Sequence, residues 1–153
     1  MVIIDRESID SLFLFGGITL GDINKEYCMI MHRKMWIWIA EQIDSGYYIG
    51  IYELKKKFWR DNEISVADPS MFNYCFCCLY ACSINNTDVY DNKIKGYRAC
   101  KDCLVKWNSN SKNCQCCDKN SEYNILKQLE KQNRLKELAI QCRKISELRG
   151  SKD

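Results

Sequence analysis

The feature that most constrains what this chain can fold into is a cluster of cysteines in its second half. Nine of the eleven cysteines lie between Cys75 and Cys117. Three pairs in this segment have the spacing Cys-x-x-Cys, namely Cys75 with Cys78, Cys100 with Cys103, and Cys114 with Cys117. Two intervening residues let both sulfurs of a pair turn toward one point, and zinc takes four such ligands in a tetrahedron. The cluster therefore predicts a segment that folds around bound zinc.

More than one ligand set fits this pattern. The first choice has a spacing close to that of a zinc ribbon, and it consists of Cys75, Cys78, Cys100 and Cys103. Cys114 and Cys117 are alternates, because they lie just before a helix predicted from Ser121, as in a treble-clef arrangement. A cluster of two zinc ions that uses all six thiolates is a third arrangement, and an iron–sulfur centre is a fourth.

The predicted metal is structural. Catalytic zinc usually keeps an open position and has histidine or carboxylate ligands, whereas His32 is the only histidine of the chain. His32 follows Cys28 by four residues, so the two could grip a metal from one helix face. A partly buried helix histidine beside Trp36 is the preferred interpretation. The sequence contains no other catalytic constellation, and we expect that the protein is not an enzyme.

Helical periodicity dominates the first half of the chain. Residues 27–43 form the clearest predicted helix, which is apolar nearly all round, and Gly46 suits a left-handed cap behind it. Residues 51–59 predict an amphipathic helix with lysines 55–57 on its polar side. Residues 7–15 suit a short helix.

The second half combines the cysteine segment with further helix. A loose hairpin is expected between Cys82 and Cys100, and residues 121–148 predict a helix that bends near Gln132, or two helices. The expected fold is a small, mainly α, zinc-stabilised domain in which helices flank a zinc-ribbon-like or treble-clef-like cysteine module. Its predicted parts are an N-terminal helical part (1–70), the zinc-binding module (71–120) and a C-terminal helix or bent helix pair (121–153).

Charge and hydropathy limit the cellular setting. The chain has 23 basic and 20 acidic residues, a net charge of +3, which is too mild to indicate nucleic-acid binding by itself. The longest apolar run, residues 35–40, is much shorter than a membrane span, and no basic n-region precedes an apolar segment at the start. We therefore expect a cytoplasmic protein without membrane contact. In the reducing cytosol, clustered cysteines are more often metal ligands than disulfides.

Two kinds of side chain are candidates for contact with a partner. Tryptophan and tyrosine often anchor protein interfaces, although aromatic residues at helical spacing usually belong to a core. The basic candidates gather in the second predicted helix beside a tryptophan, and the set is Lys55, Lys56, Lys57, Arg60 and Trp59. Lysines 55–57 also fit a solvated helix face. If nucleic acid binds, the basic residues of this cluster, together with Lys101 and Lys106 near the cysteine pairs, are the expected contact.

Three segments carry a resemblance to a known family, namely residues 32–40 (HRKMWIWIA), 73–81 (NYCFCCLYA) and 100–107 (CKDCLVKW), followed by a closing helix that ends at Leu148. They resemble a group of short cysteine-rich proteins encoded by bacteriophages and prophages of low-GC bacteria, a group without an assigned activity. That pattern has two Cys-x-x-Cys pairs and a later cysteine. This chain has several more cysteines, which leaves the ligand set open. The resemblance implies a phage accessory protein that works in the cytoplasm of the bacterial host.

Two functions follow from these features. The first is a zinc-stabilised protein that binds a host protein, or a protein–nucleic-acid complex, and inhibits a bacterial defence system such as CRISPR. The small size, the aromatic content and the near-even charge favour it. The alternative is a zinc-dependent nucleic-acid-binding regulator, in which the cysteine pairs present basic side chains.

Overall fold

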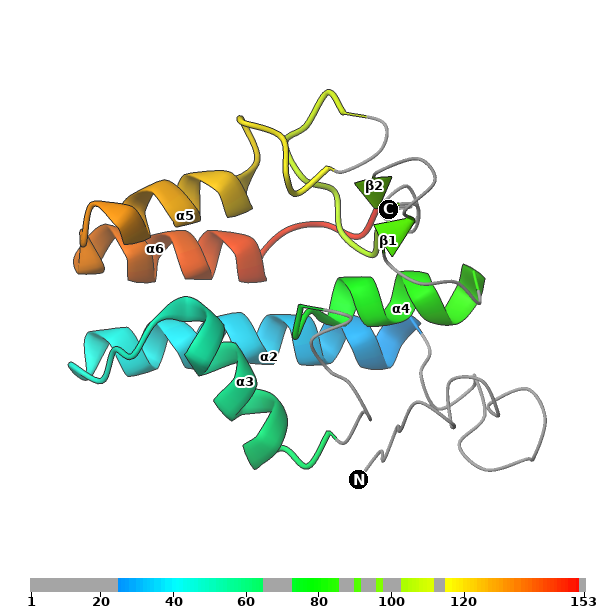
Figure 1. The fold of residues 1–153 in the computed structure, drawn as a ribbon. Helices are drawn as coiled ribbons and strands as arrows, with labels where there is room; N and C mark the ends of the chain where they lie inside the picture. Colours follow the sequence, from blue (N-terminus) through cyan, green and yellow to red (C-terminus); the bar gives the residue numbers. More distant parts are fainter. Residues whose placement is uncertain are drawn as a thin grey trace.

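The computed structural model describes residues 25–64, 73–85, 90–91, 96–97, 103–111 and 115–151, and these residues are mainly helical, as predicted. The helices are α2 (Lys25–Asp44), α3 (Ile51–Asp61), α4 (Phe76–Asn85), α5 (Glu122–Lys131) and α6 (Leu135–Ser146). Figure 1 shows α5 and α6 as a hairpin lying along α2, with α4 against the N-terminal half of α2. A zinc-ribbon or treble-clef geometry is not shown by the described residues.

Helix α2 confirms the helix predicted over residues 27–43, and its packing explains why that sequence is apolar nearly all round. Helix α6 packs along it, and α3 and α4 contact it as well, so side chains on several sides of α2 are buried. The helix ends at Asp44 and is followed by Gly46, whose φ of 87° is left-handed. The amide of Tyr47 donates to the carbonyl of Gln42 at 2.9 Å, and that of Gly46 donates to Ile43 at 3.0 Å. These bonds form the Schellman motif that the predicted cap requires.

Helix α3 confirms the second predicted helix and is capped from a distant part of the chain. Gly50 precedes it with a φ of 104° and offers no side-chain cap. The carboxylate of Glu130, at the end of α5, takes that role: it accepts the amide of Ile51 at 2.8 Å and the hydroxyl of Tyr48. The start of α3 is thereby tied to the end of α5.

The predicted bend near Gln132 is a break between two helices. Ser121 caps α5, since its hydroxyl accepts the amide of Asn124 at 3.0 Å. The helix ends before Asn133, which has a left-handed φ of 53°, and the amide of Arg134 donates back to Leu129 at 3.1 Å. Because asparagine tolerates this conformation better than most residues, the chain reverses here and α6 returns beside α5.

The cysteine segment contains a helix, α4, that the spacing argument did not predict. Its sequence FCCLYACSIN has no glycine or proline, and Phe76 stacks on Trp59 of α3 with ring centroids 4.7 Å apart. Strands β1 (Tyr90–Asp91) and β2 (Gly96–Tyr97) pair antiparallel, within the region of the expected hairpin. The segment after Cys103 pairs with the chain end, where the amide of Lys106 donates to Arg149 at 2.8 Å.

One hydrophobic core joins all three predicted parts of the chain, since it contains residues of α2, α3, α4, α6 and the segment around Val105. The short helix expected over residues 7–15 lies outside the described residues. Within the described ranges, no helix is long and apolar enough to span a membrane.

Candidate metal centre

Cys75 occupies the N-terminus of α4, and an unusual turn leads into it. Asn73 and Tyr74 have left-handed φ angles of 50° and 49°, which non-glycine residues seldom adopt. The carbonyl of Cys75 accepts the amide of Leu79 at 3.0 Å, so Cys75 is the capping residue. Its sulfur accepts the backbone N–H of Cys78. A helix N-terminus stabilises negative charge, so this position favours a thiolate.

Neighbouring thiols reinforce this effect at Cys75. Hydrogen bonds from the side chains of Cys77 and Cys78 hold the pKa of Cys75 well below that of an ordinary thiol, and the ammonium of Lys55 adds to the lowering. Hydrogen bonds to Cys103 and then to Cys75 raise the pKa of Cys77 well above its ordinary value. Cys77 therefore holds its proton more tightly than the two sulfurs beside it, Cys75 and Cys103.

Cys103 is the second sulfur with a stabilised thiolate. A hydrogen bond from Cys77 is the largest cause that lowers the pKa of Cys103, and the backbone N–H of Val105 and the indole of Trp107 also lower it. The indole Nε1 of Trp107 donates to the sulfur of Cys103 at 3.2 Å. Backbone and indole N–H donors of this kind are the partners that a metal-bound thiolate needs around it.

His32 adjoins the cysteines from the side of α2. Its side chain is fully buried, and burial is the largest cause that lowers its pKa. Its Nε2 lies 3.1 Å from the carbonyl oxygen of Ile145 in α6, and its Nδ1 lies 3.4 Å from the sulfur of Cys77. The sequence predicted a partly buried histidine on this helix, and the prediction underestimated how deeply His32 is buried. The sequence signal for the contact was the four-residue spacing of Cys28 and His32, which places both on the buried face of α2.

The structure brings part of the predicted ligand set together. Cys75, Cys78 and Cys103 belong to one network of sulfurs, in which Cys78 contacts Cys75 and the side chain of Cys77 connects Cys75 with Cys103. Cys77 belongs to none of the predicted ligand sets, and its side chain is buried in α4, which begins at Phe76. Cys100 lies outside the described residues.

The alternate pair is placed less favourably. Cys117 is exposed and disulfide-bonded. A sulfur in a disulfide is not a thiolate, so zinc binding by Cys117 requires its reduced form. Cys114 is likewise outside the described residues.

The donor chemistry of the sulfur network fits zinc. Thiolate sulfur and imidazole nitrogen are ligands that zinc prefers, and the N–H donors at Cys75 and Cys103 supply the surrounding hydrogen bonds. Among the residues described, no three His, Cys, Asp or Glu side chains are arranged so that they could hold one ion as they lie. The first-choice set needs Cys100 as its fourth member, so the described residues supply only three of its sulfurs.

Two of the predicted partner contacts must be corrected. Lys55 is 2 % exposed and Trp59 is 1 % exposed, so both belong to the core and neither lies on an exposed basic face. The ammonium of Lys55 lies over the rings of Trp36 and Tyr123, 6.0 and 5.5 Å from their centroids. The helical wheel misplaced this lysine because its long stem reaches from the flank of α3 into the core.

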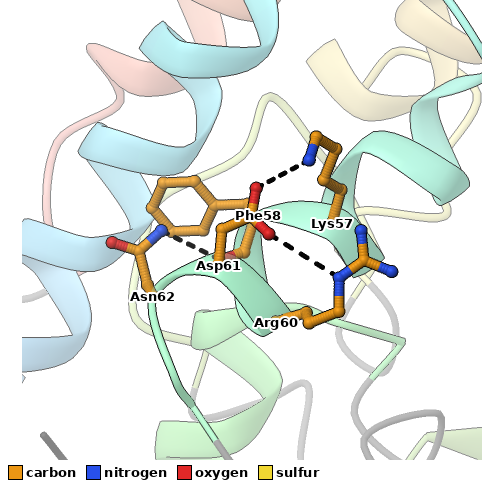
Figure 2. A network of polar contacts seen from close by, with 5 residues as sticks. All are labelled: Lys57, Phe58, Arg60, Asp61 and Asn62. Carbon is orange, nitrogen blue, oxygen red and sulfur yellow. Dashed lines mark hydrogen bonds and ion pairs between the residues drawn. The ribbon is translucent and has the colours of Figure 1, made fainter.

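The remaining basic candidates are on the surface of α3 and are paired with carboxylates. Lys57 binds Asp61 at 2.8 Å, and the guanidinium of Arg60 lies 3.6 Å from the same carboxylate (Figure 2). Lys56 lies 3.7 Å from Glu53. The hydrogen bond from Lys57 is the largest cause that lowers the pKa of Asp61. The face therefore carries opposite charges side by side and not a basic patch.

The buried sulfurs of this network are poorly placed to present a nucleophile to a substrate. The sulfurs of Cys77 and Cys103 belong to buried residues, with 1 % and 7 % exposure, and His32 is enclosed between α2, α4 and α6. A substrate would have to displace core side chains to reach them. No family model, no curated protein and no solved structure matches this chain.

Proposed function

We propose that this chain is a zinc-stabilised phage accessory protein that binds a host macromolecule and acts by binding instead of catalysis. The proposed partner is a protein of a bacterial defence system, which the chain inhibits in the host cytoplasm in the manner of an anti-CRISPR protein. Zinc is structural in this proposal, with Cys75, Cys78, Cys100 and Cys103 as its ligands. The phage context depends on the family resemblance, and the binding role depends on an exposed surface of the fold.

The observation that carries the proposal is the surface along the seam of α2 and α6, which we call the α2–α6 face. Ile37 of α2 lies on this face at 43 % exposure, and the same two helices carry two further exposed isoleucines, Ile30 of α2 at 44 % and Ile140 of α6 at 48 %. An open groove of about 510 Å³ lies in this seam, lined by Arg33, Ile37, Arg143, Ser146 and Glu147. Apolar side chains beside arginines are typical of the centre of protein interfaces.

The location of the cysteine network supports a structural role for the metal and a separate surface for partner binding. The network lies inside the fold and contacts the helices from which the α2–α6 face is built, through His32 of α2 and the carbonyl of Ile145 in α6. Metal bound there would stabilise the packing of these helices, and thereby the groove between them, without contacting a partner.

The charge pattern favours a protein partner over nucleic acid. A phosphate-binding surface needs unpaired lysines and arginines, whereas Lys56, Lys57 and Arg60 lie beside Glu53 and Asp61. Arg143 in the groove binds Asp44 at 2.6 Å. A zinc-dependent nucleic-acid-binding regulator therefore remains the weaker alternative.

A matched pair of variants tests the proposal. Ile37→Glu places a charge in the α2–α6 face, and Ile125→Glu places one on α5 at a similarly exposed isoleucine. In a host with active CRISPR interference, the wild-type chain and Ile125→Glu should raise phage plating efficiency, and Ile37→Glu should not. Nuclease-treated capture should show the same pattern for the target protein. Equal activity of both variants, or binding to nucleic acid that weakens steeply with salt, would contradict the proposal.

A further inference from the structure

The imidazole of His32 is held in one tautomer, with one nitrogen directed at the cysteines. A carbonyl oxygen only accepts hydrogen bonds, so the Nε2 of His32, 3.1 Å from the oxygen of Ile145, carries the proton. Nδ1 then keeps its lone pair, and this atom faces the sulfur of Cys77 at 3.4 Å. Metal-binding histidines are oriented in this way, because the other ring nitrogen donates to a carbonyl and fixes the ring.

The distance between these two atoms also suits a shared metal ion. With zinc–sulfur bonds of about 2.3 Å and zinc–nitrogen bonds of about 2.0–2.1 Å, a tetrahedral angle separates the two ligands by roughly 3.5 Å. The observed 3.4 Å is close to this value. Cys77 in turn contacts Cys103 and Cys75, so two more sulfurs adjoin it in the core.

We propose that the metal centre is a Cys₃His site formed by His32 Nδ1 and the sulfurs of Cys75, Cys77 and Cys103, and that it takes zinc or a similar thiophilic divalent cation. This inference rests on the proposed zinc binding and changes its ligands, since Cys77 and His32 take the places of Cys78 and Cys100. The described side chains do not yet surround one point, so binding requires side-chain rotation at the cysteines. The thiol proton of Cys77 leaves to solvent when the metal binds.

The wild-type protein provides the decisive test, because His32 is its only histidine and gives a single set of imidazole signals. Protein labelled with ¹⁵N is compared without metal, with Zn²⁺ and with ¹¹³Cd²⁺. We expect the His32 Nδ1 resonance to shift on metal addition, Nε2 to stay protonated, and ¹¹³Cd to couple to the ring. Stoichiometric metal with an unchanged Nδ1 resonance would overturn the Cys₃His site and leave His32 as a hydrogen-bonding core residue.

Variants then separate the two ligand sets by Co²⁺ titration of the full chain. Cys77→Ser and Cys78→Ser alter adjacent residues of α4, and Cys142→Ala is a control for a buried cysteine of α6. We expect Cys77→Ser and His32→Gln to lower the affinity by at least about tenfold, Cys78→Ser to lower it clearly less, because a serine hydroxyl can still donate to Cys75, and Cys142→Ala to bind as wild type does. Loss of binding in Cys78→Ser but not in Cys77→Ser overturns the inference and supports the first-choice set. If the wild-type chain binds no metal, both the inference and the zinc proposal fail.

Discussion

At the scale of single residues, Lys55 is a basic side chain placed inside the core near the cysteine network. Its ammonium lies over the rings of Trp36 and Tyr123, and aromatic faces attract cations. The same charge lowers the pKa of Cys75. A thiolate-rich metal site carries net negative charge, so this ammonium stabilises both the thiolate and the loaded site.

We predict that Lys55→Met weakens zinc binding by about tenfold, or ~1.4 kcal/mol. Methionine preserves much of the apolar stem and removes the charge that favours the thiolate of Cys75. The measurement is competition with a chelator of known affinity. Lys56→Met, at a partly exposed neighbour, is the control and should bind zinc as wild type does; equal affinities of the two variants would show that the Lys55 charge has no role.

Cys142 gives a prediction for the dependence of stability on pH. Burial raises the pKa of this thiol to about 12, while an unfolded thiol ionises near a pH of about 8.5. Between these values the unfolded chain loses the proton and the folded chain keeps it, so the contribution to stability is present below pH ~8.5 and is lost as the pH rises. The loss is about 1.4 kcal/mol per pH unit for this group.

Urea unfolding of the wild type and of Cys142→Ala at several pH values isolates this contribution. Other titrating groups are common to both proteins, so the difference in the free energy of unfolding should shrink by about 1.4 kcal/mol per unit above pH ~9. Parallel pH profiles for the two proteins would mean that the thiol of Cys142 is not protected from ionisation.

At the scale of helices, the turn after α2 depends on the backbone of Gly46. With φ at 87° and nothing within 4 Å of an added Cβ, the cost of Gly46→Ala is conformational and not steric crowding. We predict a loss of about 1–2 kcal/mol in the free energy of unfolding, measured with urea. Ser45→Ala, which removes only an exposed hydrogen bond to Gln42, should cost clearly less. Equal losses would place the effect outside the backbone of Gly46.

The start of α3 depends on a carboxylate from another helix. Glu130 accepts from the amide of Ile51 and from the hydroxyl of Tyr48. Two hydrogen bonds to a charged acceptor at a helix N-terminus predict a loss of about 2–3 kcal/mol for Glu130→Ala. Glu137→Ala is the control, because its ion pair with Arg134 is exposed and should contribute less than ~1 kcal/mol. Additive effects of Glu130→Ala and Tyr48→Phe in a double-mutant cycle would contradict the shared contact.

At the scale of the whole molecule, periodicity predicted the helices, whereas long-range contacts decided the details. The helices over residues 27–43 and 51–59, the cap at Gly46 and the break after Gln132 follow from local patterns, and the structure confirms them. Helix α4 was missed, because the Cys-x-x-Cys spacing suggested a knuckle where the helix is stabilised by Phe76 packing on Trp59.

For the candidate site, the sequence predicted that some of the cysteines lie together, but it did not predict all the residues that contact them. The cysteine spacing identified Cys75, Cys78 and Cys103, and the structure connects all three. The contact between Cys77 and His32 could not be predicted from local sequence patterns. It depends on how α4 packs against α2 and on the carbonyl of Ile145, which orients the imidazole ring. The burial of Lys55 likewise depended on an aromatic pair drawn from α2 and α5.

If the folded chain binds zinc, its free energy of unfolding must depend on the concentration of free zinc. A ligand that binds only the folded chain stabilises it by RT ln(1 + [Zn]/Kd), so each tenfold rise in free zinc above Kd should add about 1.4 kcal/mol per bound ion to the free energy of unfolding. Because the one core includes Cys77 and Cys103 together with residues of α2, α3 and α6, we expect one cooperative transition. The measurement is urea unfolding in chelator-buffered zinc.

Cys103→Ser supplies the control for this linkage. It removes a sulfur that belongs to both ligand sets and whose thiolate is stabilised by Trp107 and Val105. Its free energy of unfolding should be nearly independent of free zinc, and magnesium should have no effect on either protein, because thiolates disfavour that ion. A wild-type stability that does not change with free zinc would show that the folded chain has no preferential affinity for the metal, and the cysteine network would then be a packed group of thiols.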